Sequence, residues 1–235
     1  MADNKGGLQF SFWSRFYDGC TRLIGYGNKF RIENLRVAGI DASRPLRVLD
    51  VGCGTGELAM AVAAHSAPGS TITGIDPVPA MLEIAKRKRV SRGMTKHGAV
   101  DISFKQGTIE RLAFESNTFD VVLCTMVVHH LNRVLKYSGF KEIWRVLKPG
   151  GAFIIADFGI PTQHGSLSFV TAVKLGLFLY FNFMETIAGN FTETIVDHFT
   201  GILPALLEYV GFERVIYVQS SFKRAIFIKS IKPDI

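Results

Sequence analysis

The sequence predicts an α/β fold in which a seven-stranded, mostly parallel sheet carries helices on both faces and ends in an antiparallel hairpin. Two observations lead to this prediction. First, short apolar runs alternate with helical patterns between residues 46 and 157, and wholly apolar strands are typical of parallel sheets covered on both faces. Second, two strand-like runs near the C-terminal end are separated only by Gln219–Phe222. A parallel pair would need a crossover of a dozen or more residues, so these two strands must be antiparallel.

The N-terminal part contains a helical pattern over Asn28–Ala38, which Gly39 is expected to end. Arg44 and Pro45 then break the chain before the first strand. The alternating part that follows is predicted to contain five strands and three helices. The strands are Leu46–Val51, Thr71–Ile75, Val100–Phe104, Phe119–Cys124 and Ala152–Ala156, and the helices are Leu58–His65, Met81–Arg92 and Tyr137–Leu147.

The last part of the chain returns to regular structure after an interruption. Pro204 lies in the first turn of a predicted helix that stops at Gly211. The strands Glu213–Val218 and Lys223–Ile228 follow, and they complete the count of seven. We therefore expect an N-terminal helical cap over 1–45 and a main domain over 46–235, into which an apolar segment, 158–200, is inserted.

Composition limits the classes of protein to consider. Hydrophobic residues make up 48% and charged residues 20% of the 235 residues, which excludes a disordered chain. The three cysteines form no CxxC pair, so neither a disulfide framework nor a metal site is predicted. The first ten residues lack the apolar core of a signal peptide. A reducing, cytoplasmic setting fits best.

The chain is also basic and apolar. Lys and Arg number 27 against 20 Asp and Glu, which gives a net charge of +7. The mean hydropathy is +0.22. Together these values favour anionic or lipid partners, and peripheral attachment to a membrane stays open.

A glycine-rich loop follows the first predicted strand and opens the first core helix. The stretch reads VLDVGCGTGELA over residues 48–59, and glycines let the backbone turn sharply and come close to a ligand. Asp76 ends the next strand, where a carboxylate can accept both ribose hydroxyls of an adenosine ligand. Asp50 and Glu57 flank the loop and would repel a pyrophosphate. S-adenosylmethionine has an ammonium and a sulfonium but no phosphate, so the acids favour it over a dinucleotide.

The chain resembles the class I S-adenosylmethionine-dependent methyltransferases, and it is most similar to the ubiquinone/menaquinone C-methyltransferase (UbiE-like) branch. The matching segments are the glycine loop, GIDPVPAML over 74–82, FDVVLCTMVVHHL over 119–131 and RVLKPGG over 145–151. The resemblance implies a Rossmann-like fold of seven strands and S-adenosylmethionine as the methyl donor. The main domain would then be the methyltransferase domain.

The resemblance also implies which residues bind the cofactor. The methionine part would be wrapped by Asp50, Gly52, Cys53, Gly54 and Gly56; Asp76 would hold the ribose, with Pro77 and Met81 beside the adenine; Cys124 and Thr125 would face the sulfonium, and Tyr17 would close over the site. One departure concerns the adenine amino group. Family members carry an Asp after the third strand for this contact, and Thr108 stands there in this chain.

Three polar residues at the carboxyl ends of the fourth and fifth strands are catalytic candidates. His129 and His130 follow the fourth strand, and an imidazole can take a proton from a phenol or an enol near neutral pH. Asp157 ends the fifth strand, where it can act as a base or attract a cationic amine. His164, in the inserted segment, is a further candidate.

The inserted segment contains the apolar stretch Ser166–Glu185, which Lys174 and Asn182 interrupt. Three interpretations stay open: a lid over the cleft, a helix on a membrane surface, and ordinary core or a dimer contact. The basic run Lys86–Arg89, with Arg92 and Lys96, is a solvated helix face, a contact for lipid headgroups or a contact for nucleic acid.

The sequence therefore predicts a methyltransferase that acts on a small hydrophobic or lipid-like acceptor, either a quinone precursor or a phospholipid amine headgroup. An RNA or protein methyltransferase is an alternative, motivated by the net charge. Nucleic acid is a less favoured partner because no RNA-binding module is visible and no NPPY-like motif follows the fourth strand. A non-catalytic S-adenosylmethionine-binding module is a further alternative, and an oligomer stays open.

Overall fold

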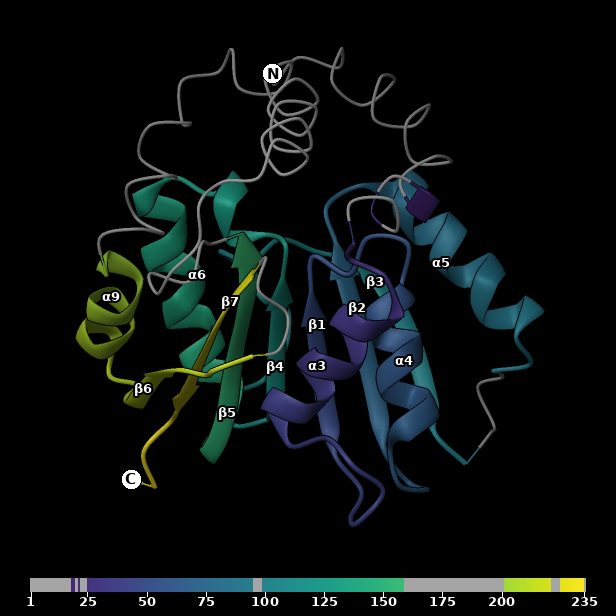
Figure 1. The fold of residues 1–235 in the computed structure, drawn as a ribbon, viewed down its shortest axis with the longest axis horizontal. Coiled ribbons are helices and arrows are strands. Elements are labelled where there is room, and N and C mark those ends of the chain that lie inside the picture. The colour runs from purple at the N-terminus through teal and green to yellow at the C-terminus, as the bar shows by residue number, and fades with distance from the viewer. Residues whose placement is uncertain are drawn as a thin grey trace.

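A twisted sheet of seven strands, with helices on both faces, forms the centre of the molecule (Figure 1). The computed structural model describes Asp18, Gly19, Thr21 and residues 25–94, 99–158, 201–220 and 225–234. The strand order is β3-β2-β1-β4-β5-β7-β6. All neighbouring pairs from β3 to β5 are parallel, and β7 is antiparallel to both β5 and β6. The strands are β1 (Arg47–Val51), β2 (Thr71–Asp76), β3 (Asp101–Gln106), β4 (Phe119–Thr125), β5 (Leu147–Phe158), β6 (Glu213–Tyr217) and β7 (Ala225–Ile231).

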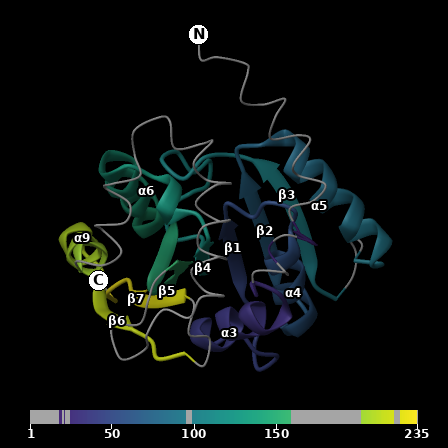
Figure 2. The ribbon, with the colours of Figure 1, turned by 45° about the horizontal axis from the view of Figure 1, so that its top comes forward.

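Two hydrophobic clusters lie on opposite faces of the sheet, because successive side chains of a strand point in opposite directions. Side chains of α3, α4 and α5 belong to the first cluster, and side chains of α6 and α9 belong to the second. Figure 2 shows the two groups of helices on either side of the strands. The helices are α3 (Asn28–Ala38), α4 (Glu57–His65), α5 (Pro79–Ser91), α6 (Arg133–Val146) and α9 (Ile202–Val210), with the short 3-10 helix η1 (Val128–His130) after β4.

Several predicted elements are confirmed to within a residue or two. The helix α3 has the predicted bounds, and Gly39 ends it with a φ of 70°, in the left-handed region. Gly211 ends α9 in the same way, with a φ of 110°. The hairpin of β6 and β7 is antiparallel, as the short connection requires. The predicted fold class is therefore correct.

The predicted bounds are wrong for three elements. The helix α6 begins four residues before Tyr137, because the Asn132 side chain accepts the Leu135 backbone N–H at 2.9 Å and caps a helix start at Arg133. The strand β5 begins at Leu147, directly after α6, and not at Ala152. Its pairing with β4 shifts register between Phe119 and Val121, so the Pro-Gly-Gly stretch lies within an irregular strand. The strand β7 ends at Ile231, three residues beyond the predicted end.

The strand β7 lies between β5 and β6 and contributes to both hydrophobic clusters. Phe227 belongs to the first cluster and Ile228 to the second. Its pairing with β5 runs from Ala152 opposite Ile231 to Phe158 opposite Ala225. The outer edge of the parallel sheet is thus covered by a strand that comes much later in the sequence.

Some predictions fall outside the described residues: the cap before Asp18 with Tyr17, the candidate His164, and the apolar stretch 166–185 with the rest of 159–200. The division into a cap and a main domain stays a prediction, although α3 packs into the first hydrophobic cluster with the strands. Within the described ranges, no helix is both long and apolar enough to cross a membrane.

Candidate functional site

The glycine loop after β1 is a tight turn whose backbone favours glycine at three positions. Gly52, Gly54 and Gly56 have φ values of 71°, 51° and 78°, in the left-handed region that side chains disfavour. The N–H groups of Gly52 and Cys53 both donate to the Ile75 carbonyl, at 2.8 and 2.9 Å, which ties the loop to β2.

The three glycines have different surroundings. A Cβ at Gly52 would lie 2.2 Å from Val127 Cγ2, and one at Gly56 would lie 2.7 Å from the Phe104 ring. These two positions are therefore closed by packing. A Cβ at Gly54 would meet no atom of the described residues within 4 Å, so Gly54 leaves open space there for a ligand.

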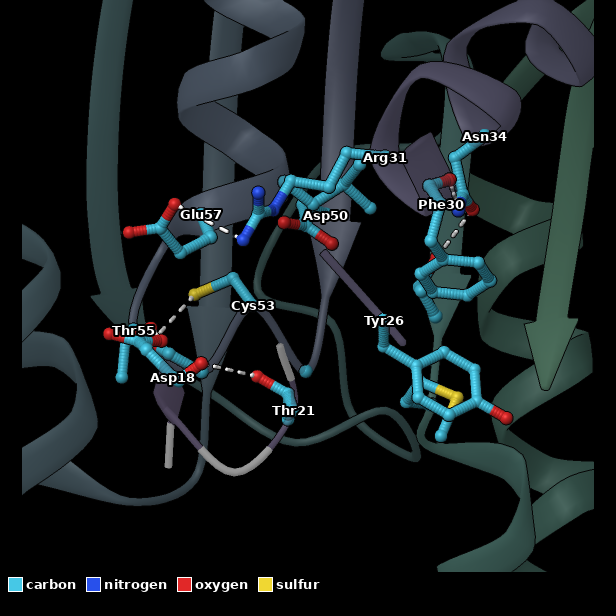
Figure 3. A pocket seen from close by; sticks show the side chains of 15 residues that line it. Asp18, Thr21, Tyr26, Phe30, Arg31, Asn34, Asp50, Cys53, Thr55 and Glu57 are labelled. Atoms are coloured by element: carbon cyan, nitrogen blue, oxygen red, sulfur yellow. Dashed lines mark hydrogen bonds and ion pairs between the residues drawn. The ribbon is translucent and has the colours of Figure 1, made fainter. Parts of the chain in front are cut away.

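A cavity lies against this loop, between the ends of β1 and β4 and the helix α3 (Figure 3). Three of its lining residues are acids with different surroundings: Asp50, Asp18 and Glu57. The lining also includes Arg31 and Asn34 from α3, and an aromatic wall. The remaining lining residues are Thr21, Tyr26, Phe30, Gly52, Cys53, Gly54, Thr55, Leu58, Thr125 and Met126.

Asp50 is a buried acid at the cavity. It is 2% exposed, and its Oδ2 has no hydrogen-bond partner among the described residues. Burial, and secondarily the charge of Asp76, raises the pKa of Asp50 to about 7, although the Ala59 backbone N–H works in the opposite direction. A buried carboxyl with an unsatisfied oxygen favours a cationic ligand group, which would stabilise its charged form.

Asp76 lies at the end of β2 and is 7% exposed. Its Oδ2 accepts the Gly54 N–H and its Oδ1 accepts the Val78 N–H, each at 2.9 Å. Burial raises the pKa of Asp76, and these two N–H groups oppose that rise. The two bonds fix the carboxylate between the glycine loop and the residues after β2, the place where a ribose would lie.

A second cavity is lined by residues that include both sequence neighbours of Asp76. Pro77 and Thr108 line it together with the apolar side chains of Ile75 and Phe114, and Lys105, Gln106, Gly107, Arg111 and Ala113 complete the lining. Its walls suit a flat, aromatic base. Of the other residues expected near the cofactor, Met81 is 4% exposed and lines neither cavity, and Cys124 is fully buried in the second hydrophobic cluster.

The structure corrects the prediction that Glu57 would repel a pyrophosphate. This acid does not present a net negative charge to the cavity, because Lys88 and Arg92 bind its Oε1 at 2.9 and 2.7 Å and Arg31 lies 3.4 Å from its Oε2. The acid near the loop that disfavours a pyrophosphate is therefore Asp50. Lys88 and Arg92 also belong to the predicted basic run, so part of that run pairs with acids inside the molecule.

Asp18 joins the N-terminal part of the chain to the ion pairs around Glu57. Its Oδ1 accepts the Thr55 hydroxyl at 2.6 Å, and its Oδ2 forms an ion pair with Lys88. From the other side of the cavity, the fully buried Asn34 accepts the Thr125 hydroxyl at 2.9 Å. The end of β4 is thereby tied to α3, and Met126 follows with a φ of 59°, a conformation uncommon for a residue with a side chain.

The candidate catalytic residues His129 and Asp157 lie together at the carboxyl edge of the sheet. His129 Nδ1 lies 2.7 Å from Asp157 Oδ1, and the His129 backbone N–H donates to Asp157 Oδ2 at 3.1 Å. The Asp157 side chain is fully buried and that of His129 is 12% exposed. His130 is exposed, with its ring centre 3.9 Å from that of His129. In the described contacts, His129 is the ring that the Asp157 carboxylate orients.

Sequence reasoning missed several lining residues, namely Asp18, Arg31, Asn34 and Tyr26. They precede the glycine loop and carry no motif of their own. Arg31 and Asn34 lie on the polar face of the predicted helix Asn28–Ala38, which is equally consistent with a solvated face, whereas Asp18 and Tyr26 precede that helix.

The two cavities offer walls of different chemistry. The first offers a buried carboxylate and open space at Gly54 for a cationic amino acid, and the second offers apolar walls for a base. Together with the strand order, this site defines the class: a methyltransferase that uses S-adenosylmethionine.

Comparisons with known proteins agree. A family model described as a methyltransferase domain matches residues 49–155. The chain is 29% identical to a demethylmenaquinone methyltransferase of Chlorobaculum tepidum, over 92% of this chain and 87% of that protein. It is 32% identical to one from Thermus thermophilus, over 74% of each. Among solved structures, phosphoethanolamine N-methyltransferase 2 of Haemonchus contortus, in complex with S-adenosyl-L-methionine, has a TM-score of 0.64 at 18% identity, covering 94% of this chain and 60% of that one.

The chain therefore belongs to the class I S-adenosylmethionine-dependent methyltransferases, in the UbiE-like branch. It is an enzyme, and S-adenosylmethionine is its methyl donor. In the ranges that the structure describes, no cluster of three or more metal-ligating side chains is present.

Proposed function

We propose that this enzyme transfers the methyl group to a ring carbon of a hydrophobic, quinol-type acceptor. The names of the relatives, demethylmenaquinone methyltransferases, support this acceptor class. The positive mean hydropathy of +0.22 is consistent with an apolar substrate. The observation that carries the proposed chemistry is the 2.7 Å contact between His129 and Asp157.

A ring carbon must be made nucleophilic, and this is the task that we assign to His129. When bound, S-adenosylmethionine supplies a methyl group on a positively charged sulfur, which needs no further activation. With Nδ1 donating to Asp157, proton acceptance falls to Nε2. The buried carboxylate then stabilises the imidazolium that forms after a ring hydroxyl gives up its proton.

The electron balance follows from that proton transfer. The electron pair of the hydroxyl oxygen moves into the ring, and a ring carbon forms the new bond to the methyl carbon. The carbon–sulfur bond breaks with its electrons on sulfur. The ring carbon then gives up its own proton, which leaves to solvent as the net proton of the reaction, and the His129 imidazolium returns the first proton to the ring oxygen, which restores the aromatic hydroxyl. The pair of His129 and Asp157 thus holds one proton, and the alignment of the acceptor with the methyl donor supplies the rest of the rate enhancement.

Aromatic side chains connect His129 to the cavity at the glycine loop. The His129 ring centre lies 4.7 Å from that of Phe158, which lies 5.4 Å from Tyr26, and Tyr26 lies 4.9 Å from Phe30. Edge-to-face contacts of this kind form a rigid apolar wall. Such a wall suits a flat, apolar acceptor and keeps water away from the transferring methyl group.

The test is a partition assay with methyl-labelled S-adenosylmethionine. The purified enzyme receives, in separate reactions, a reduced demethylquinone with a short isoprenoid tail in detergent micelles, phosphoethanolamine, and total RNA. We expect label in the organic phase of the first reaction only. Label on the amine or on RNA, with none on the quinol, would replace the proposed acceptor with one of those two.

Variants test the assigned base. His129→Gln should lower kcat by about 10²–10⁴-fold, the usual contribution of a general base, with the dissociation constant for S-adenosylhomocysteine unchanged. Asp157→Asn should lower kcat as well. His65→Gln is the matched control, because His65 is exposed on α4 and bonds only to the Ala61 carbonyl of its own helix in the described contacts. A His129→Gln enzyme as active as the control would refute the assignment.

A further inference from the structure

The outer face of α6 and α9 carries large apolar side chains that are exposed to water. Val134 is 75% exposed, and Tyr137, one turn further along α6, is 37% exposed. Tyr209 on α9 is 77% exposed, and its ring centre lies 5.9 Å from that of Tyr137. Such residues are unremarkable when scattered, but a group drawn from two neighbouring helices indicates an interaction site.

Positive charge borders this group. Lys141 Nζ lies 5.5 Å from the centre of the Tyr137 ring, and Val134, Tyr137 and Lys141 share one face of α6 through their spacings of three and four residues. The exposed charged side chains of the two helices are Arg133 and Lys141 on α6 and Glu208 on α9, so the positive sign prevails. We call Arg133, Val134, Tyr137, Lys141 and Tyr209 the α6–α9 surface.

The other basic surface that the sequence indicated is the run Lys86–Arg89 on α5, at the opposite end of the sheet (Figure 1). Three of its four cations contact an acid or a backbone carbonyl within the molecule, which leaves Arg87 without a partner in the described contacts. Val90, at 66%, is the one strongly exposed apolar side chain of α5, a helix that the structure describes throughout. The α6–α9 surface is therefore the more apolar of the two, and it alone presents aromatic rings.

The α6–α9 surface is continuous with the rim of the candidate catalytic site. His129 lies in the short helix η1, which leads directly into α6. Val134, in the first turn of α6, is thus close to the carboxyl edge of the sheet, where His129 and Asp157 lie together. An acceptor that dissolves in lipid can reach this edge from a bilayer without crossing water. In this respect the inference rests on the proposed function.

We propose that the α6–α9 surface docks the enzyme on an anionic lipid surface. Tyrosine has an apolar ring and a polar hydroxyl, so Tyr137 and Tyr209 fit the level of the lipid headgroups. Arg133 and Lys141 pair with lipid phosphates beside them. Exposed aromatic rings next to cations complement a membrane in both respects, because it offers anionic groups above an apolar layer.

The first test is co-sedimentation of the wild-type enzyme with vesicles, without acceptor or cofactor. The probes are vesicles of phosphatidylcholine with phosphatidylglycerol, and vesicles of phosphatidylcholine alone. We expect binding to the anionic vesicles that weakens with salt, and binding about tenfold weaker to the neutral ones. Absence of binding to the anionic vesicles at low salt would overturn the proposal. It would leave the proposed acceptor untouched, because no methyl transfer is measured.

The second test assigns the binding to this surface. The double variant Tyr137→Ser/Tyr209→Ser should lower the partition coefficient by about tenfold. Lys141→Glu should lower it by about 25-fold, because the reversal changes the charge by two units. Lys141→Glu alone keeps the test decisive if the double variant fails to fold, which binding of S-adenosylhomocysteine would report.

The matched controls are Arg87→Glu and Val90→Ser, which make the same kinds of change on α5. We expect each to alter the partition coefficient by less than about threefold. If Arg87→Glu weakened binding as much as Lys141→Glu, net charge or the α5 surface would explain it, and the assignment to α6 and α9 would be wrong.

A second copy of the chain is the competing occupant, and sedimentation velocity without vesicles identifies it. We expect the same sedimentation coefficient for the wild type and for Tyr137→Ser/Tyr209→Ser. A wild-type dimer that this double variant converts to a monomer would assign the surface to self-association and overturn the proposal.

Discussion

Replacing Asp50 with Asn should remove the pH dependence of cofactor binding between about pH 5.5 and 7.5. Asp50 is almost fully buried, and burial together with the charge of Asp76 raises its pKa to about 7. An ammonium group binds the charged carboxylate. Below pH 7 the carboxyl must first release its proton, and each pH unit costs about 1.4 kcal/mol.

The magnitude follows from that pKa. The protonated fraction of Asp50 rises from about a quarter at pH 7.5 to nearly all at pH 5.5, which corresponds to an affinity loss of about 25-fold. The Asn variant should bind more weakly overall, because it lacks the charge, and its dissociation constant should be nearly the same at both pH values.

Isothermal titration calorimetry with S-adenosylhomocysteine measures both effects. Paired buffers of different ionisation enthalpy also report protons: the wild type should release close to one proton per ligand near pH 6, and Asp50→Asn should release none. A wild-type profile that is flat with pH would refute the reasoning. An Asn variant with the wild-type slope would show that another group titrates.

The raised pKa of Asp50 has the opposite effect on the stability of the protein without ligand, which should be higher at low pH. Its folded value lies above the value of about 3.9 for an unfolded Asp, so the folded protein keeps this proton between about pH 4 and 7 while the unfolded chain loses it. The free energy of unfolding should therefore fall as pH rises through this window, by up to about 4 kcal/mol from this group. Urea unfolding of the wild type and of Asp50→Asn at pH 4.5 and 7.5 gives the comparison.

Further substitutions probe the site and its supports. Gly54→Ala, whose Cβ enters open space, should cost only about 1–2 kcal/mol of stability through its positive φ but weaken S-adenosylhomocysteine binding by about tenfold. Gly56→Ala, whose Cβ would lie 2.7 Å from Phe104, should lose about 2–5 kcal/mol of stability in urea. Equal losses of stability in the two variants would contradict this contrast. Asp76→Ala should weaken binding by about 1–3 kcal/mol, and an unchanged dissociation constant would count against the ribose site. Asn132→Ala should lower the free energy of unfolding by about 1 kcal/mol through loss of the α6 cap, with recovery in Asn132→Asp.

Much of the core was predictable because local signals and the global fold agree there. The glycine loop, the acid after β2 and the apolar strands each carry a local pattern, and parallel strands must bring their carboxyl ends to one edge. Asp50, Asp76 and Thr125 meet at that edge for this reason. The fold also brings His129 next to Asp157, from the ends of adjacent strands β4 and β5.

Other features depend on packing that no local pattern shows. The helix α6 was predicted to begin at Tyr137, whereas the capping role of Asn132 becomes visible only in its bond to Leu135. The role of Glu57 was misjudged because its three cations come from α3 and α5, which approach it only in the folded chain. Arg31 was missed for the same reason.

The position of β7 between β5 and β6 has a consequence for how the chain folds. Until β7 docks, the outer edge of β5 exposes unpaired backbone groups beside the apolar run Ala152–Ala156, and such an edge is prone to pair with other chains. The contact between β5 and β7 joins residues far apart in sequence, so it forms slowly. Yield of native protein, rather than activity per folded molecule, should therefore respond most to changes in β7, and aggregation during refolding should increase with temperature and chain concentration.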